Sequence, residues 1–229
     1  MTLIQVIDAA RSIINAPLDS TRTFPDDSSN FWGDTTLTTY HNIVQEELAG
    51  DLVQTFEDYF VTSTTFNIVS GQVEYSLPSD FIKARRVEDV RNGNAIEIRP
   101  ITLNDKGEVI LGLGLSGTIF DDGYFIKGTK LVFSDTPSFT QGSAVKMYYV
   151  KRLADLSTTA ATATSEIPPE HHRGLVWGIA KIALQQQQSD NNFAALEYEK
   201  IRKDIMRNAE DRQVQRPRKV KETKARAFL

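Results

Sequence analysis

The fold is decided by residues 62–77, which read TSTTFNIVSGQVEYSL. Here β-branched and aromatic residues alternate with polar ones, which is the two-residue period of β-strands. Up to about Phe60 the apolar residues instead recur every three or four positions, as they do in helices, and this period returns over residues 168–209. The sequence therefore predicts an α+β protein in which a strand-rich segment, over about residues 66–150, interrupts a helical one.

Two helices are predicted before the strand-rich segment. Thr2 can cap the first helix, whose apolar stripe is Leu3, Val6, Ile7, Ala10, Ile13 and Ile14. A loop rich in Pro, Asp, Ser and Thr follows over residues 15–30, and Asp34 is predicted to cap the second helix. The stripe of that helix is Leu37, Tyr40, Val44, Leu48, Leu52 and Phe56.

Two more helices are predicted after it. Pro168, Pro169 and Glu170 suit the first turn of a third helix, because proline tolerates that turn and a carboxylate favours the positive helix end. Its apolar face is Leu175, Val176, Ile179, Ile182 and Ala183. The fourth helix follows the break at residues 190–192 and carries Ala194, Tyr198, Ile201 and Ile205 on one face.

The strand-rich segment is predicted to form antiparallel hairpins. One would join residues 66–69 to 73–77 through Ser70-Gly71, and another would join 83–90 to 95–99 through Asn92-Gly93, a dipeptide that suits a tight hairpin turn. Further strands are expected at 117–120, 124–127, 130–133 and 144–150. A short helix within residues 101–111 stays open.

The apolar stripes of the four predicted helices must be buried, and they can be buried against one another. This predicts one domain rather than two. The simplest solution packs residues 1–62 and 166–211 into an antiparallel helical bundle. Residues 63–156 would then be an inserted antiparallel β module, and 157–165, which contain only Ser, Thr and Ala, an exposed linker. Residues 212–229 would form an extended basic C-terminal arm.

Charge is spread unevenly along the chain. The last eighteen residues hold one acidic side chain, Glu222, and seven basic ones, which gives the arm +6 and leaves −10 for residues 1–211 of a chain whose net charge is −4. A run of like charge often serves as an interaction arm, and its apolar end suits a pocket in a partner protein. The candidate partner-binding residues are Arg212, Arg216, Arg218, Lys219, Lys221, Lys224, Arg226, Phe228 and Leu229.

No catalytic, cofactor-binding or metal-binding residues are predicted. The run GLGLSG at residues 112–117 matches a dinucleotide fingerprint, but strands rather than a helix are expected after it, so we interpret it as a loop. His171 and His172 point about 100° apart at a helix start and cannot share a metal, and His41 lies far away in sequence. There is no cysteine, no signal peptide is expected, and no apolar run approaches the roughly 20 residues that span a bilayer.

Four segments together resemble the head-to-tail connector (adaptor) proteins of tailed bacteriophages. Their order and spacing match over most of residues 1–210. The segments are Phe31-Trp32-Gly33-Asp34, residues 74–81 followed by Arg85-Arg86-Val87, residues 147–156, and Ile167-Pro168-Pro169-Glu170-His171-His172.

The resemblance implies a structural role without catalysis or cofactors. Similar proteins form a ring, of twelve copies, beneath the portal ring of the capsid, and their C-terminal segment reaches the portal protein. The ring extends the channel through which double-stranded DNA passes without specific binding, and it meets a tail or nozzle component below. The implied location is the neck of the virion, with assembly in the host cytoplasm and no membrane.

Two alternatives remain open at this point. The basic arm could attract phosphate groups, which would make the protein a nucleic-acid-binding one. Stacking on single strands would need aromatic residues such as Tyr148 interleaved with the basic residues of Arg85-Arg86 or Lys151-Arg152 on one sheet face. An enzyme with a site assembled from distant residues is the third reading.

Overall fold

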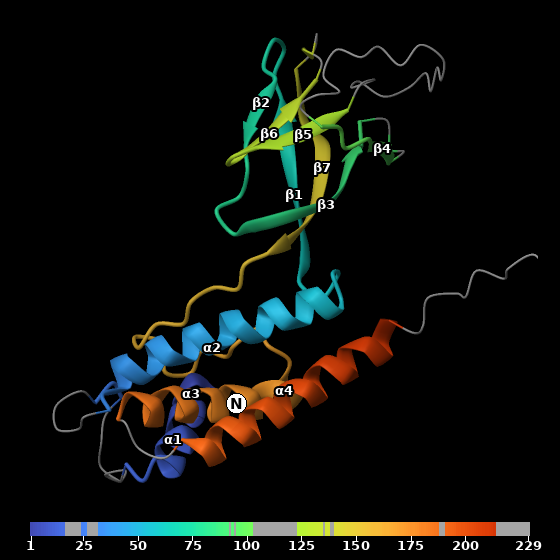
Figure 1. Ribbon diagram of the computed structural model, residues 1–229. Coiled ribbons are helices and arrows are strands. Elements are labelled where there is room, and N and C mark those ends of the chain that lie inside the picture. The colour runs from blue at the N-terminus through green and yellow to red at the C-terminus, as the bar shows by residue number, and fades with distance from the viewer. Residues whose placement is uncertain are drawn as a thin grey trace, which may run out of the picture. The chain divides into compact units, whose positions relative to one another are not determined.

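The computed structural model describes residues 1–16, 24–26, 32–91, 93, 95–102, 123–134, 136–137, 140–187 and 191–213. Contacts divide the chain into two compact units (Figure 1). The helical unit comprises Met1–Phe56 and Asp155–Leu229, and the β unit comprises Glu57–Ala154. The α+β class with antiparallel sheets is therefore as predicted.

Four α-helices lie in the described part of the helical unit. They are α1 (Leu3–Ile13), α2 (Asp34–Thr55), α3 (His172–Gln186) and α4 (Asn192–Gln213), and a 3-10 turn, η2 (Pro169–His171), precedes α3. All four stripes predicted from the sequence lie mainly on buried faces. Across the described helices, none is long and apolar enough to span a membrane.

Helix α3 contacts each of the other three helices and lies between α2 and α4 (Figure 1). Two glycines allow this close approach. A Cβ at Gly178 would lie 2.4 Å from Cγ1 of Val44 and 3.0 Å from Cε2 of Tyr198, and one at Gly174 would lie 3.2 Å from Cδ1 of Leu48. The absence of side chains at these positions thus lets residues from both ends of the sequence share one interior.

The start of α2 differs from the prediction. Gly33 precedes the helix and Asp34 is its first residue, so Asp34 is not the cap. Instead its Oδ1 accepts hydrogen bonds from Nε and Nη2 of Arg11, at 3.2 and 2.8 Å, and both side chains are fully buried. Its Oδ2 accepts the backbone N–H of Asp26 at 2.8 Å. The carboxylate is used to neutralise a buried guanidinium of α1, which outweighs its value as a cap.

The segment before α3 is not an exposed linker along its whole length. The carbonyls of Ala163 and Ala161 accept the backbone N–H groups of Leu3 and Ile4, at 2.8 and 3.2 Å. These are among the first N–H groups of α1, which have no partner inside the helix. Ser165 is buried and donates to Oε1 of Gln45 on α2 at 2.5 Å, so the prediction of exposure is wrong there.

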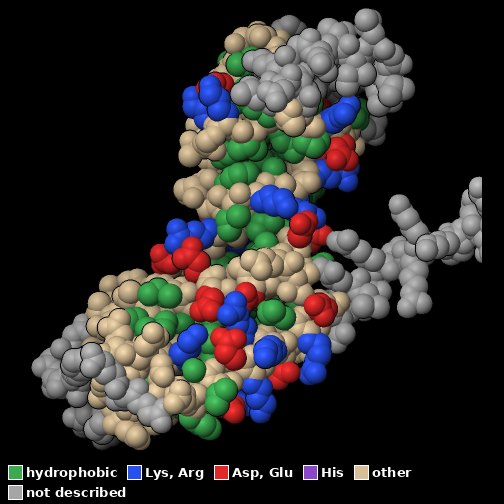
Figure 2. Space-filling model, in the orientation of Figure 1, with side chains coloured by type: hydrophobic (Ala, Val, Ile, Leu, Met, Phe, Trp, Pro, Cys, Tyr) green, Lys and Arg blue, Asp and Glu red, His purple; other side chains and the backbone are tan. Residues whose placement is uncertain are grey.

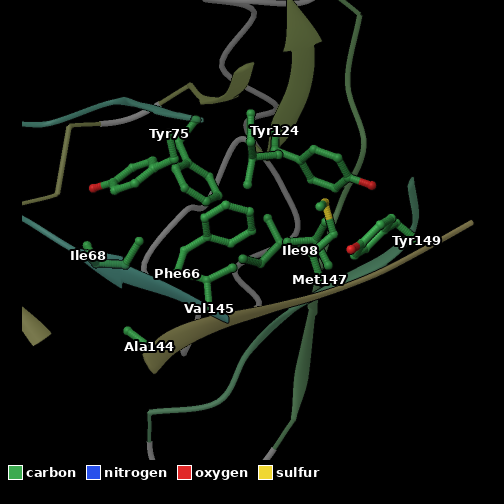
Figure 3. Packing of buried hydrophobic residues seen from close by; sticks show 12 residues of the cluster. Phe66, Ile68, Tyr75, Ile98, Tyr124, Ala144, Val145, Met147 and Tyr149 are labelled. Atoms are coloured by element: carbon green, nitrogen blue, oxygen red, sulfur yellow. The ribbon is translucent and has the colours of Figure 1, made fainter. Parts of the chain in front are cut away.

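The β unit contains two antiparallel sheets. The four-stranded sheet has the order β1-β7-β3-β4 and the three-stranded sheet the order β2-β6-β5. The strands are β1 (Val61–Ile68), β2 (Glu74–Ser76), β3 (Phe81–Asp89), β4 (Ile96–Ile98), β5 (Tyr124–Lys127), β6 (Lys130–Phe133) and β7 (Gln141–Lys151). Side chains from the two sheets point toward one another and form one apolar cluster (Figure 3).

Aromatic rings hold the centre of this cluster. Phe66 of β1 meets Tyr75 of β2 edge-on at 6.2 Å between ring centroids, and Tyr75 meets Phe133 of β6 at 5.6 Å. Edge-to-face pairs at such distances are favourable beyond the burial of their area. Figure 3 shows Phe66 together with Val145 and Met147 of the central strand β7.

The predicted hairpin of residues 66–69 and 73–77 is wrong. A turn is present, since Gly71 has a φ of +82° and Gln72 N–H donates to the carbonyl of Val69. The strands that flank it separate, because β1 pairs with β7 and β2 pairs with β6. The turn carries the chain from one sheet to the other, which lets Phe66 and Tyr75 face each other across the core.

The other described hairpins agree with the prediction. β3 pairs with β4 beside Gly93, whose φ is +75°, and β5 pairs with β6 beside Gly128, whose φ is +58°. The strand predicted at 117–120 and the glycine run at 112–117 lie outside the described residues, as does most of the open helix at 101–111.

Candidate assembly surfaces

The predicted partner-binding residues follow helix α4. The helix runs to Gln213, so Arg212 is helical and an extended arm can begin only after that residue. The remaining candidates lie outside the described residues: Arg216, Arg218, Lys219, Lys221, Lys224, Arg226, Phe228 and Leu229. What the structure does describe is the helix from which this segment departs.

Helix α4 is held against α2 by the guanidinium of Arg202. Its Nη2 lies 2.8 Å from Oδ1 of Asp51, its Nε pairs with the other oxygen of the same carboxylate, and its Nη1 lies 3.1 Å from Oε1 of Glu47. A two-pronged pair of this kind fixes orientation as well as distance. The hydrogen bond to Asp51 raises the pKa of Arg202, which stays charged.

Packing adds to this attachment. Tyr198 of α4 is fully buried, and Nζ of Lys181 on α3 lies 4.6 Å from the centroid of its ring. Burial raises the pKa of the Tyr198 hydroxyl. At about 1.5 Å per residue, the 22 residues of α4 span roughly 33 Å. The C-terminal segment therefore starts from the end of a long helix whose first half is fixed.

The visible face of the helical unit carries basic and acidic side chains side by side (Figure 2). Lys200 and Arg207 of α4 pair with Glu197 and Asp204, which lie three residues earlier in each case. Such exposed pairs contribute little to stability. This face is thus mixed in charge, in contrast to the C-terminal sequence that follows it.

The outer face of the four-stranded sheet brings together residues relevant to the nucleic-acid reading. Register places Tyr148 beside Arg86, and Nζ of Lys146 lies 4.7 Å from the centroid of the Tyr148 ring. Nε of Arg86 lies 2.7 Å from Oε1 of Glu88, which faces Lys146 across the strands. The cations of this face therefore have carboxylates beside them, which weakens its attraction for phosphates.

A register shift in β3 separates the two consecutive arginines. The shift falls between Ala84 and Arg86 and sends Arg85 to other partners. Nε of Arg85 lies 2.9 Å from Oδ1 of Asp58, and its Nη1 pairs with Glu57. Hydrogen bonds and charge from Lys83 and Arg85 lower the pKa of Glu57.

An open hollow of about 390 Å³ lies in this region of the β unit. It is lined by Asp58, Val61, Arg85, Arg86, Glu88 and Tyr148. The two arginines and their carboxylates pair with one another, as described above. Within the described ranges, no three or more His, Cys, Asp or Glu side chains are grouped to hold a metal ion.

The three histidines are all buried in the helical unit. Nδ1 of His172 lies 2.7 Å from the amino group of Met1 and its Nε2 lies 2.7 Å from the carbonyl of Ile167, so Nε2–H donates and Nδ1 accepts. Burial lowers the pKa of His172 and that of His41. Position 41 falls on the stripe of Leu37 and Val44, a spacing that indicates burial in the sequence itself.

Sequence reasoning missed the polar contacts that join the helices. Arg11 was recognisable only as an interruption of an apolar stripe, which signals a buried partner without naming Asp34. Asp51 carries the same kind of signal, since it lies three residues after Leu48 on the stripe of α2, but nothing in the sequence pairs it with Arg202. Pairs so distant in sequence become visible only in the fold.

Comparison with known proteins identifies the family. The family model described as SU10 adaptor protein matches residues 1–221, which is nearly the whole chain and spans both units. No curated protein matches the sequence. A match of this extent shows that the chain belongs to the SU10 adaptor protein family, in agreement with the resemblance of its motifs to phage head-to-tail adaptors.

Proposed function

We propose that the protein is a structural head-to-tail adaptor of a tailed phage. It forms a ring of twelve copies under the portal, extends the DNA channel and links the capsid to the tail or nozzle component below. It resides in the neck of the virion and assembles in the host cytoplasm. Membership of the SU10 adaptor family supports this proposal most directly.

The C-terminal segment is the proposed portal-binding element. It follows a helix fixed by Arg202 and Asp51, and from Arg212 onward its sequence carries +6 with an apolar tip at Phe228 and Leu229. The segment is attached to a fixed helix, is positively charged and ends in apolar residues. These features suit binding to an acidic partner surface that has an apolar pocket. The basic residues would attract the partner, and the two apolar residues would fill its pocket.

The acidic body suits the wall of a DNA channel. Residues 1–211 have a net charge of −10, and like charge keeps the phosphates of double-stranded DNA from adhering to the wall. DNA would then pass without specific binding. We also expect weak association of free subunits, because rings formed before the portal is present would compete with ordered assembly.

Removal of residues 214–229 tests the proposal while leaving α4 complete. The truncated chain should keep its circular dichroism spectrum and lose binding to the portal ring of the same phage, as seen by co-sedimentation and negative-stain images. A matched control keeps the length but replaces only Phe228 and Leu229 with Ser, and it should weaken binding without abolishing it. Full portal binding by the truncated chain would rule out this role for the segment.

The seven basic residues also favour a second candidate, a nucleic-acid-binding protein. If all seven contacted phosphates of duplex DNA, the logarithm of the affinity would fall with the logarithm of salt concentration with a slope of roughly −6. We expect the full chain to lack such a salt-dependent affinity in fluorescence anisotropy. A steep slope that disappears on truncation, with portal binding unchanged, would favour the second candidate.

A further inference from the structure

Two exposed hydrophobic side chains of α4, Phe193 and Leu196, lie on the helical unit with the half-buried Trp177 of α3, and we name these three residues the α3–α4 patch. Phe193 is 68% exposed and Leu196 71% exposed. The rings of Trp177 and Phe193 meet edge-on with 5.5 Å between centroids. Single exposed apolar residues are ordinary, but two neighbouring ones on α4 beside an aromatic ring of α3 mark an interaction surface.

The rim of the α3–α4 patch is positively charged. Arg173 and Lys200 are both exposed, and both pair with the same carboxylate, Glu197, at 3.6 and 4.0 Å. One carboxylate between two cations leaves a net charge of +1 on the rim. The α3–α4 patch therefore offers apolar side chains flanked by excess positive charge.

Helix α2 presents a second exposed surface of opposite character. Ile43 is 50% exposed, and residues at helical spacing along the same side are also exposed: Thr35, Thr39, Glu46 and Gly50. The whole helix contains no lysine or arginine. We name this surface the Ile43 face; it offers one large apolar side chain beside an acidic one.

We propose that the Ile43 face of one copy docks on the α3–α4 patch of the next copy, as the lateral contact of the ring. This inference rests on the proposed function. Helix α2 carries no cation that would repel the positive rim, whereas a patch that met its own copy would bring two positive rims together. The cationic C-terminal segment is disfavoured as the occupant for the same reason.

The two surfaces differ, so each copy in such a contact keeps its other surface free for a further neighbour, and the pair keeps one free surface of each kind. Contacts of this head-to-tail type close into rings or extend as filaments, while self-complementary ones stop at dimers. The four apolar side chains bury only a few hundred Å² between them, well short of the roughly 1,200–2,000 Å² of stable interfaces. The contact is thus weak in a pair and is reinforced when a partner gathers the copies.

The chain has no natural cysteine, so single cysteines can test the contact directly. The double variant Ile43→Cys with Leu196→Cys, oxidised at high concentration as full-length protein, should give a ladder of covalent multimers. An equal mixture of the two single variants should stop at dimers, and Leu196→Cys alone should give none. The control Ile43→Cys with Asn208→Cys, about 18 Å further along α4, should cross-link much less.

Three results from the cysteine variants would overturn the inference: no ladder from the double variant, dimers from Leu196→Cys alone, or equal cross-linking of the Asn208 control. Removing residues 214–229 should leave the ladder unchanged, and its loss would show that the C-terminal segment makes the contact instead. The portal is absent from this experiment. A ladder without portal binding would contradict only the proposed portal role. Portal binding without a ladder would contradict only the proposed lateral contact.

Discussion

The helical unit and the β unit are held together by different interactions. Elements of the helical unit are joined by buried polar pairs between residues far apart in sequence, such as Arg11 with Asp34. The β unit has a cluster of apolar side chains between two sheets, and ion pairs such as Lys83 with Glu57 lie on its surface. Buried charge therefore adds to apolar packing in specifying how the helices fit together, whereas apolar packing and strand register specify the sheets.

Loss of the buried charge pair should have the largest effect. Arg11→Met leaves the Asp34 carboxylate buried without its cation, which costs about 3–5 kcal/mol. Both tryptophans of the chain, Trp32 and Trp177, lie in the helical unit, so urea unfolding followed by tryptophan fluorescence measures this effect there. Arg85→Met in the β unit, followed there by hydrogen exchange of the β7 amides, is the matched control and should change little, because its partners Glu57 and Asp58 are exposed to water.

A second change at the same site sharpens the comparison. The double variant Arg11→Met with Asp34→Asn removes both charges and should recover part of the loss, because no buried charge is left unpaired. If the double variant were less stable than Arg11→Met by a further several kcal/mol, charge would not be what joins α1 to α2.

Packing at Gly178 should have an intermediate effect. An alanine Cβ there would meet Val44 at 2.4 Å, and overpacking of a core costs about 1–3 kcal/mol, partly offset by the better helix propensity of alanine. A Cβ at Gly50 on α2 would meet no atom within 4 Å, so Gly50→Ala should instead stabilise the unit by up to about 1 kcal/mol. Thermal unfolding of the two variants checks this opposition, and the same sign for both would contradict it.

Acidification should have the smallest effect and should act on the helical unit. Burial lowers the pKa of His41 and His172 below that of the unfolded chain, near 6.5, so the folded unit favours neutral imidazoles. Stability is then fully present above about pH 6.5 and falls as pH drops below that value, because the unfolded chain binds the protons. The β unit contains no histidine, and the lowered pKa of Glu57 keeps that carboxylate charged at pH 5.

Tryptophan fluorescence in urea at pH 7 and pH 5 gives the measurement for the helical unit, and hydrogen exchange of the β7 amides gives it for the β unit. His41→Gln should flatten the pH dependence of the helical unit even if it lowers stability at both values. If both units lost the same stability between pH 7 and pH 5, protonation of the histidines would not be the cause of the loss.

Patterns that repeat along a single element were readable in the sequence. The helical stripes, such as the one through Leu37 and Val44, and the turn beside Gly93 depend on neighbours in the chain, and the structure confirms them. The turn at Gly71 was also readable, but its role was not. Whether two strands that flank a turn pair with each other depends on distant competitors, here β7 for β1 and β6 for β2.

Part of the candidate binding site was likewise predictable from the sequence, and part of it depends on the fold. The composition of the C-terminal segment predicts a charged element with an apolar tip, because charge is countable without a fold. How the preceding helix α4 is attached could not be predicted, because the pair of Arg202 and Asp51 joins residues that lie far apart in the sequence. The α3–α4 patch likewise combines Trp177 with Phe193, and periodicity along either helix alone does not show that these two rings meet.

The carbonyls of Ala161 and Ala163 that complete the first turn of α1 have a consequence for the order of synthesis. On the ribosome the opening helix emerges long before the residues that satisfy its N–H groups, and before α3, against which it packs. The strands of the β unit are made in between and need nothing from residues after Ala154 to complete their ladders. The β unit can therefore fold before the helical unit during synthesis. The contacts between α1 and residues 161–186 form only after those later residues have been translated.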